Sequence, residues 1–556
     1  MPSEPRTVAS PEAIARLEDI VGKAHVSTGE EEIDRRSRCI IPWRRRCAAV
    51  VYPGSVEEIR QIVLAAAQLK LPLWTFSKGK NWGYGATMAN RDGAIVLILE
   101  RLNRILEVNE ELAYAVVEPG VTYRQLHDHL RGTGSKLWSD SSDGPPEGSV
   151  LGNALDKGVG ETPYGDHFGT LCGLEVVLPN GDVLRTGGGP PQCHTWNTHK
   201  WGTGPVLDGL FAQSNYGIVT KAGVWLMPAP QHFNSFSFEL REEKDLPALI
   251  DVMRRLALGG VFSCAHHLIN DVCVLTIVTQ NPHAADGGGT RLSPQMVAQL
   301  RRRYRISPWA IAGALYGSKK RVRADQAEIR RVLGPLGRVQ FFSDGKAATV
   351  ARLHPRLKRA VARGGLPRAA ANFVTGTLFH TSLELMEWVP YVHSLLQGAP
   401  TEYFVRHAYF KSSRPRPDHD VDPVRDGCGN IWFAPMVPLS GAHVTRVLEM
   451  CRPLFEQFGF DFYVAMLMHN PRSIIALMSI FYQPENAEET KKASELYEKL
   501  CHVTLDAGYQ QYRTSVAYMD RIFARTPELR RALDGIKGAV DKDNILAPGR
   551  YGIGLS

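Results

Sequence analysis

The segment from Gly148 to Gly187 constrains the fold of this chain more than any other part of it. It is dense in glycine and ends in LEVVLPNGDVLRTG, where Asn-Gly separates two apolar runs in the manner of a β-hairpin. Glycine lets backbone N–H groups approach a ligand closely, so such a loop feeding two strands can surround a phosphate. An ordinary connecting loop is the alternative. Two further glycine segments, around 77–85 and 214–221, favour a cradle for an anionic or flat ligand.

A chain of 556 residues is too long for one hydrophobic core, so we expect at least two domains. Its composition, 44% apolar and 22% charged with a formal net charge of +8, is that of a globular protein. Basic clusters at 301–305 and 319–323 lack the interleaved aromatic side chains of a base-stacking surface. No nucleic-acid partner is therefore expected.

The N-terminal residues lack the basic leader and apolar core of a signal peptide, and no apolar run approaches the roughly 20 residues that span a bilayer. The nine cysteines are odd in number and scattered, without a CxxC pair. His167, His407 and His469 are isolated histidines without metal-ligand spacing, for which structural roles are expected. We therefore expect reduced thiols, a cytoplasmic location, no membrane partner and no metal site.

Local patterns predict mixed α+β structure. Residues 47–85 read as strand, amphipathic helix, strand and glycine loop, with Ser55 and Glu58 as a capping box before the helix. From about Phe233 glycine motifs become sparse, and runs read as strands, at 272–279 and 473–482, alternate with helices. The last fifty residues return to motif-rich loops. These shifts predict a discontinuous first domain, 1–231 with 501–556, and a cap-like domain, 232–500.

Six motifs together resemble the vanillyl-alcohol oxidase and p-cresol methylhydroxylase family of flavoenzymes, in the family's order and with near-family spacing. They are SKGKNWGYG (77–85), VEPGVTYRQL (117–126), GSVLGNALDKGVGETPYGDH (148–167), SNYGIVTK (214–221), YRTSVAYMD (512–520) and NILAPGRYGI (544–553).

The resemblance implies an α+β fold, with a two-subdomain FAD-binding domain (1–231), a cap domain with an antiparallel sheet over the isoalloxazine (232–500), and a C-terminal segment (501–556) that returns to the first domain. Glycine loops from separate strands suit FAD, and no Rossmann GxGxxG opens a helix. Lys78 and Lys80 replace an apolar residue and an arginine of relatives. The residues assigned to the cofactor are Ser77, Lys78, Gly79, Lys80, Asn81, Gly83, Pro119, Gly148, Ser149, Gly152, Asn153, Gly158, Gly160, Tyr164, Gly165, Gly217, Ile218, Val219, Asn430 and Arg550.

The implied reaction is oxidation of a para-substituted phenol, such as a 4-hydroxybenzylic alcohol or a 4-alkyl or 4-allyl phenol. Hydride leaves for flavin N5 and a p-quinone methide forms, with dioxygen as the electron acceptor. A free phenol has a pKa of about 10, so the site must lower it by about 2 to 3 units, roughly 3 to 4 kcal/mol. By resemblance Tyr84, Tyr512 and Arg513 hold the phenolate, and arginine offers a permanent charge on a directional fork.

Asp143 falls at the family's acidic residue near the flavin, where a carboxylate can act as a base toward water that adds to the quinone methide. Asp140 is the competing choice, and spacing to the glycine run favours Asp143. Three residues are assigned to the substrate pocket. Trp432 replaces a smaller aromatic residue and Glu161 replaces an aromatic one, while Met478 completes the set. Glu161 either recognises a donor or cation on the substrate, pairs with Lys157 or faces solvent.

Two departures from the family concern the covalent link to FAD. Many relatives attach the flavin through a histidine or tyrosine in the segment that here reads CGNIWFAP, and this chain has Asn430 there. The histidine that assists the reaction would fall near Ser37, where none exists. We therefore expect non-covalent FAD, with Cys428 as the remaining nucleophile for a link.

Three alternatives stay open. One is a dehydrogenase or hydroxylase of the same fold that passes electrons to a cytochrome or another acceptor protein. Another is a flavin-binding protein without phenol oxidase activity, against which the retained Tyr84, Asp143, Tyr512 and Arg513 argue. A flavoenzyme acting on 2-hydroxy acids or sugars is disfavoured by the same residues. The linker at 187–208 is shorter than the octamer-promoting insertion of some relatives, so we expect a homodimer.

Overall fold

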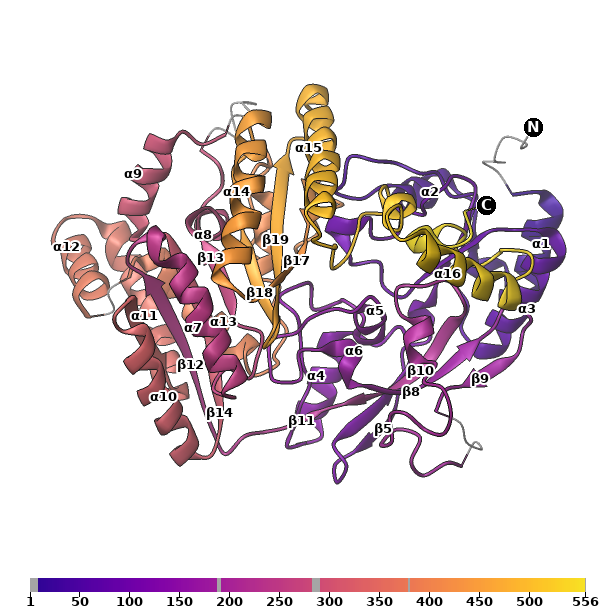
Figure 1. Cartoon of the computed structure of the whole chain (residues 1–556), viewed down its shortest axis with the longest axis horizontal. Helices are drawn as coiled ribbons and strands as arrows, with labels where there is room; N and C mark the ends of the chain where they lie inside the picture. The colour runs from indigo at the N-terminus through magenta and orange to yellow at the C-terminus, as the bar shows by residue number, and fades with distance from the viewer. Residues whose placement is uncertain (1–8, 188–191, 283–290, 379–380, 556) are drawn as a thin grey trace.

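The computed structural model describes residues 9–187, 192–282, 291–378 and 381–555. Figure 1 shows two lobes, and both ends of the described chain lie on the same one. That lobe carries the first two sheets, whereas the third sheet and most of the long helices form the other lobe. No helix among the described residues is long and apolar enough to cross a membrane.

The first sheet has the strand order β1-β2-β4-β3, and β4 pairs in parallel with both β2 and β3. The predicted strand, helix and strand of residues 47–76 are confirmed, and Ser55 accepts a hydrogen bond from Glu58 N at 3.1 Å at the start of the helix. The elements are α1 (Pro11–Val21), β1 (Val26–Ser27), α2 (Glu30–Ser37), β2 (Ala49–Val51), α3 (Val56–Leu69), β3 (Leu73–Phe76) and β4 (Ile95–Ile98).

The second sheet is antiparallel, with the order β5-β6-β10-β8-β9. The predicted hairpin is β8 with β9, and Gly181 takes a φ of 84° at its turn. The elements are β5 (Ile105–Asn109), β6 (Tyr114–Val117), α4 (Tyr123–Gly132), β7 (Leu137–Trp138), α5 (Val150–Leu155), α6 (His167–Thr170), β8 (Leu171–Val177), β9 (Val183–Arg185), β10 (Ile218–Trp225) and β11 (Met227–Pro228), of which β7 and β11 form a separate pair.

The third sheet has eight strands in the order β15-β12-β14-β13-β18-β19-β16, with β17 also paired to β19. The strand pairs among its described residues are antiparallel, as the resemblance implied for the cap. Its strands are β12 (His232–Leu240), β13 (His267–Asn270), β14 (Trp309–Gly317), β15 (Gly337–Phe342), β16 (Gly429–Phe433), β17 (Met436–Pro438), β18 (Ala465–Asn470) and β19 (Ser473–Tyr482).

Helices surround this third sheet, and α14 packs against both α7 and α15 (Figure 1). The helices are α7 (Leu246–Leu258), α8 (Asp271–Val278), α9 (Pro294–Tyr304), α10 (Lys319–Leu333), α11 (Asp344–Arg363), α12 (Gly365–Phe373), α13 (Leu383–Leu395), α14 (Gly441–Phe458) and α15 (Ala487–Asp506).

The prediction of a strand at 272–279 is wrong, because this run forms α8. Asn270 caps the helix by accepting a hydrogen bond from Cys273 N at 2.9 Å. Six of its residues are buried, so the sequence carries no polar face that would reveal a helical period. A short, wholly apolar run is equally compatible with a buried strand and a buried helix.

After α15 the chain runs back to the first lobe, where α16 (Pro527–Val540) lies against it (Figure 1). The returning backbone bonds to β3, with Leu73 N donating to Ile545 O at 2.8 Å and Ala547 N donating to Leu73 O at 2.7 Å. Residues from both ends of the sequence therefore share one wall of the lobe.

Candidate functional site

A cavity of about 320 Å³ lies where the glycine-rich loops meet the third sheet, hereafter the cap sheet, and the returning C-terminal segment. Most residues assigned to the cofactor lie on its wall. They are Ser77, Lys78, Gly79, Lys80, Asn81, Pro119, Gly148, Ser149, Gly152, Asn153, Gly217, Ile218, Val219 and Arg550. The three glycine segments that the sequence placed around a ligand thus converge on one space.

Six other residues assigned to the cofactor do not line the cavity: Gly83, Gly158, Gly160, Tyr164, Gly165 and Asn430. The placement of Gly83 has a packing reason, because a Cβ there would come within 2.2 Å of Trp432 Cδ2. A Cβ on Gly160 would likewise come within 2.1 Å of Asp140 Oδ2. These two glycines shape the loops behind the cavity instead of lining it.

The wall offers the groups that the pyrophosphate of FAD needs. Among the described residues, the backbone N–H groups of 78–80 have no intramolecular acceptor, and the buried Nε of Arg550 has no partner. The Lys78 and Lys80 ammonium groups also lie on this wall, each in an ion pair at 3.4 Å, with Glu100 and Asp422. Free N–H donors and cations around a long cavity fit a bound dinucleotide.

Tyr84, Tyr512 and Arg513 meet on one wall of the same cavity. The Arg513 guanidinium carbon lies 5.9 Å from the centre of the Tyr84 ring and 5.1 Å from that of the Tyr512 ring. Burial raises the pKa of Tyr512 to about 12 and raises that of Tyr84 further, although Arg513 opposes both shifts. Both hydroxyls therefore keep their protons at neutral pH beside a fixed cation, and in this structure the Tyr512 hydroxyl donates its hydrogen bond to Lys157 O.

Asp156 and Tyr551 hold Arg513 in place, and the sequence analysis missed both. Arg513 Nε donates to Asp156 O at 2.6 Å and lies 3.3 Å from Asp156 Oδ2. Tyr551 donates to the other oxygen of the same carboxylate at 2.9 Å. Burial lowers the pKa of Arg513, but Tyr512 and Asp156 outweigh this and hold it above its usual value. The guanidinium is thus a permanent, oriented charge.

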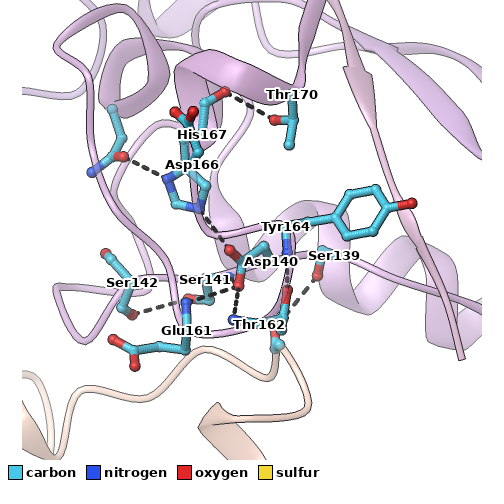
Figure 2. Close-up of polar contacts among 12 residues, drawn as sticks. Ser139, Asp140, Ser141, Ser142, Glu161, Thr162, Tyr164, Asp166, His167 and Thr170 are labelled. Carbon is cyan, nitrogen blue, oxygen red and sulfur yellow. Dashed lines mark hydrogen bonds and ion pairs between the residues drawn. The ribbon is translucent and has the colours of Figure 1, made fainter. Parts of the chain in front are cut away.

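The structure distinguishes the two candidate aspartates of the loop before the glycine run. Asp143 lies on the cavity wall. Asp140 does not: its Oδ1 accepts hydrogen bonds from the backbone N–H groups of Ser141, Glu161 and Thr162, at 2.9 to 3.0 Å, and its Oδ2 bonds His167 Nε2 at 3.1 Å (Figure 2). Asp140 therefore organises two loops, and of these two aspartates it is Asp143 that lies on the cavity wall.

Glu161 does not line the cavity, pair with Lys157 or face solvent. Its side chain extends away from the Asp140 network in Figure 2 and is only 2% exposed. Its Oε2 accepts a hydrogen bond from His267 Nε2 at 2.7 Å. His267, the first residue of β13, was missed because 106 positions separate it from Glu161.

The carboxyl and imidazole atoms of Asp143, Glu161 and His267 all lie within 4.8 Å of one another, a spacing that could hold a metal ion. No metal site was predicted. Glu161 and His267 share a hydrogen bond, so the proton on His267 Nε2 points at Glu161 Oε2 and no lone pair of Nε2 is free for a metal. We therefore interpret this trio of side chains as an ion-pair cluster.

The predicted pocket residues Trp432 and Met478 differ in their placement. Trp432 lies on the wall, with its ring edge-on to Tyr84 at 5.5 Å between centroids. The prediction for Met478 is wrong: its neighbours Ile475 and Leu477 line the cavity, whereas Met478 is fully buried in the core behind β19. Successive side chains of a strand point to opposite faces, so a shift of one residue exchanges cavity for core.

The three isolated histidines take different places. His167 links two loops by bonding Asn153 Oδ1 at 2.7 Å and Asp140 Oδ2 at 3.1 Å. His469 packs near the Tyr512 ring, 6.4 Å between centroids. His407 lies on the cavity wall, where its Nδ1 donates to Phe404 O at 2.6 Å and burial lowers its pKa. A structural role was expected for His407, but its neutral ring lies on the wall of the cavity.

The three positions considered for the family's covalent link, Asn430, Cys428 and Ser37, offer no ready nucleophile. Asn430 is fully buried on β16, and neither atom of its amide has a partner. Cys428 lies off the cavity wall, and burial raises the pKa of its thiol to about 12. Ser37 is bonded to Ile33 O, inside the protein. A thiolate or imidazole that could attack the flavin is absent from these three positions.

Comparison with known proteins agrees with this geometry. Residues 47–187 match the family model described as an FAD binding domain. The chain is 37% identical to 1'-carboxy-chondrochloren decarboxylase of Chondromyces crocatus over 97% of this chain and 96% of that protein. It is 30% identical to the 4-cresol dehydrogenase [hydroxylating] flavoprotein subunit of Pseudomonas putida over 98% of this chain and 96% of that one.

The chain belongs to the vanillyl-alcohol oxidase and p-cresol methylhydroxylase family of flavoproteins. Its fold matches that of 4-ethylphenol oxidase from Gulosibacter chungangensis in complex with isoeugenol, with a TM-score of 0.85 at 27% identity over 99% of this chain and 98% of that chain. The protein is therefore an FAD-dependent oxidoreductase with the mixed α+β fold of this family.

Proposed function

We propose that this family member oxidises para-substituted phenols at the carbon attached to the ring, with dioxygen as the electron acceptor. The substrate class comprises 4-hydroxybenzylic alcohols and 4-alkyl or 4-allyl phenols. The observation that carries the proposal is the meeting of Tyr84, Tyr512 and Arg513 on the wall of the cavity that fits FAD. Preorganised donors and a cation aimed at one oxygen stabilise a phenolate.

These residues would act before and during the loss of hydride. Tyr84 and Tyr512 would donate hydrogen bonds to the phenolate oxygen, and Arg513 would supply the neighbouring positive charge. Hydride then leaves from the carbon attached to the para position of the ring, and the phenolate becomes a p-quinone methide. Bound FAD supplies the hydride acceptor, at flavin N5. Asp143 would take a proton from water as it adds to the quinone methide.

A panel of para-substituted phenols tests this function. Mixed anaerobically with the purified holoenzyme, 4-hydroxybenzyl alcohol, 4-ethylphenol or a 4-allylphenol should bleach the flavin absorbance, while the corresponding methyl ethers should not, because they cannot form a phenolate. The absence of bleaching by every phenol would reject the proposal. Reoxidation of the reduced enzyme in aerated buffer then separates an oxidase from a dehydrogenase: slow recovery would point to a separate acceptor protein.

A second candidate is oxidative decarboxylation of a phenolic acid. It is favoured by the full-length match to a protein named as a decarboxylase, which shares more of its sequence with this chain than the 4-cresol dehydrogenase does. The panel therefore includes a 4-hydroxyphenyl acid with its carboxylate one carbon beyond the reacting carbon. Release of CO₂ together with flavin bleaching, from this compound alone, would favour decarboxylation over the proposed oxidation.

The flavin is proposed to be dissociable, since Asn430 cannot act as a nucleophile and the Cys428 thiol is buried and protonated. When the yellow holoenzyme is precipitated with trichloroacetic acid, the colour should remain in the supernatant. A yellow pellet would demonstrate a covalent link, and a Cys428→Ser variant would then show whether that sulfur is the attachment point.

A homodimer in the cytoplasm completes the proposal. The nine cysteines are all free in the structure, as in a reducing compartment. The linker on which the expectation of a dimer rests includes residues 188–191, which lie outside the described residues.

A further inference from the structure

Three segments that are distant in the sequence bring Asp143, Glu161 and His267 together. Asp143 comes from the loop before α5, Glu161 from the loop after it, and His267 from the edge of β13 in the cap sheet. Their ligand atoms lie within 4.8 Å of one another. Of the three, Asp143 alone lies on the cavity wall. Glu161 and His267 therefore lie off the cavity wall, next to a residue that is proposed to take part in the reaction.

The Glu161–His267 contact is a buried ion pair. Its two side chains are 2% and 16% exposed, and the Nε2–Oε2 distance is 2.7 Å. Burial lowers the pKa of His267, but the charge and hydrogen bond of Glu161 outweigh it and raise this pKa to about 9. Burial also raises the pKa of Glu161, and His267 opposes that shift. At neutral pH His267 is thus a cation next to Asp143.

The negative charges that act on the Glu161–His267 pair are those of two aspartates in the loop before α5. Asp143 acts on both members, and Asp140 acts on Glu161. Asp140 is engaged by three backbone N–H groups and by His167, and the charge of Arg513 is engaged by Asp156. Glu161 and Asp143 would therefore repel each other strongly if no positive charge lay close to both. His267 supplies that charge.

We propose that Glu161 and His267 are positioning residues for the proposed reaction: Glu161 holds His267 in its charged form, and His267 stabilises the negative charge on Asp143 and orients its carboxylate toward the cavity. Glu161 then has no contact with substrate, in contrast to the substrate-recognition role considered from the sequence. This inference rests on the proposed function, in which Asp143 acts as a base.

The pH dependence of water addition to the quinone methide tests it, because Asp143 is proposed to act after hydride transfer. Holoenzymes of the wild type, His267→Gln, Glu161→Gln and Asp143→Asn are reduced anaerobically by 4-ethylphenol between pH 5.5 and 9.5, and the hydrated product, 1-(4-hydroxyphenyl)ethanol, is measured relative to 4-vinylphenol, which forms without water. In His267→Gln the acidic limb of this profile should move to higher pH, with a product ratio about tenfold below wild type at pH 7 and near wild type at pH 9. Glu161→Gln should shift the limb in the same direction by a smaller amount.

A double-mutant cycle separates positioning from general damage. Added to Asp143→Asn, the His267→Gln change should have little further effect, whereas a full tenfold additional loss would overturn the proposal. A product ratio that falls equally at every pH would overturn it as well. His502→Gln, an exposed histidine on α15 outside the site, serves as the matched control and should leave the profile unchanged. If wild type is not reduced by any phenol, the proposed function fails instead.

Thermal unfolding of the same proteins tests the ion pair without turnover. Because the pKa of His267 is raised from 6.5 to about 9, the pair's stabilisation is fully present below pH 6.5 and is lost as the pH rises through 9. The wild-type midpoint should therefore fall between these pH values more than that of His267→Gln or Glu161→Gln, measured against His502→Gln. Parallel curves for all four proteins would contradict the ion pair.

Discussion

An Arg513→Ala variant should reduce its flavin with a para-substituted phenol on the order of 10² to 10³ times more slowly than wild type, the cost of removing a preorganised donor from a developing anion. Arg513 is 7% exposed and lies within 6 Å of the Tyr84 and Tyr512 rings. Without it, two neutral hydroxyls must stabilise the phenolate by themselves. Anaerobic stopped-flow absorbance at the flavin band measures the effect.

Arg513→Lys is the informative second variant. Lysine retains the charge but not the fork, so it should recover only part of the rate, since the bonds to Asp156 O and Asn153 O come from different nitrogens of the guanidinium. Arg521→Ala, a partly exposed arginine in the same segment, is the control and should change the rate less than twofold. FAD content is measured in every variant. A rate within threefold of wild type in flavin-replete Arg513→Ala would contradict the assigned role.

The contrast between Asp143 and His267 shows what the sequence could reveal about this site. Asp143 was found because it lies three residues from Asp140 and five from Gly148, inside a segment whose motif spacing is recognisable. His267 has no such neighbour in sequence, since its partner lies 106 positions away and comes close only when β13 joins the cap sheet. A histidine next to an apolar run gives no signal of a distant carboxylate.

Local sequence patterns also decided how much of the fold could be predicted. The order of β2, α3 and β3 follows from a strong amphipathic period and a cap at Ser55, both encoded within about fifteen residues. The run that became α8 had no such period, because both its faces are buried. The prediction that Met478 lines the substrate pocket was wrong for a related reason. The strand was predicted, but its pairing with β16 and β18 decides which of its faces meets the cavity.

A second large effect concerns the C-terminal segment, which is held by a buried lysine. Lys537 is 2% exposed, and its Nζ donates to Asp541 Oδ2 at 2.7 Å, Asn215 O at 2.7 Å and Leu546 O at 2.8 Å. Asp541 in turn accepts from Ile545 N and Leu546 N. Lys537→Met removes the cation from this group and leaves a buried carboxylate uncompensated, which should cost about 3 to 5 kcal/mol of unfolding free energy.

The loss of stability should also weaken cofactor binding, because the segment that Lys537 fixes carries Arg550 and Tyr551, which line the cavity. We therefore expect Lys537→Met to bind FAD more weakly, measured by flavin fluorescence on dilution, besides unfolding at lower denaturant. Lys537→Met with Asp541→Asn should recover part of the stability, since no charge is then left buried alone. Lys542→Met, on an exposed neighbour, should change stability by less than about 0.5 kcal/mol. Equal effects at positions 537 and 542 would show that the segment is anchored by its packing and backbone bonds to β3 and not by this buried charge.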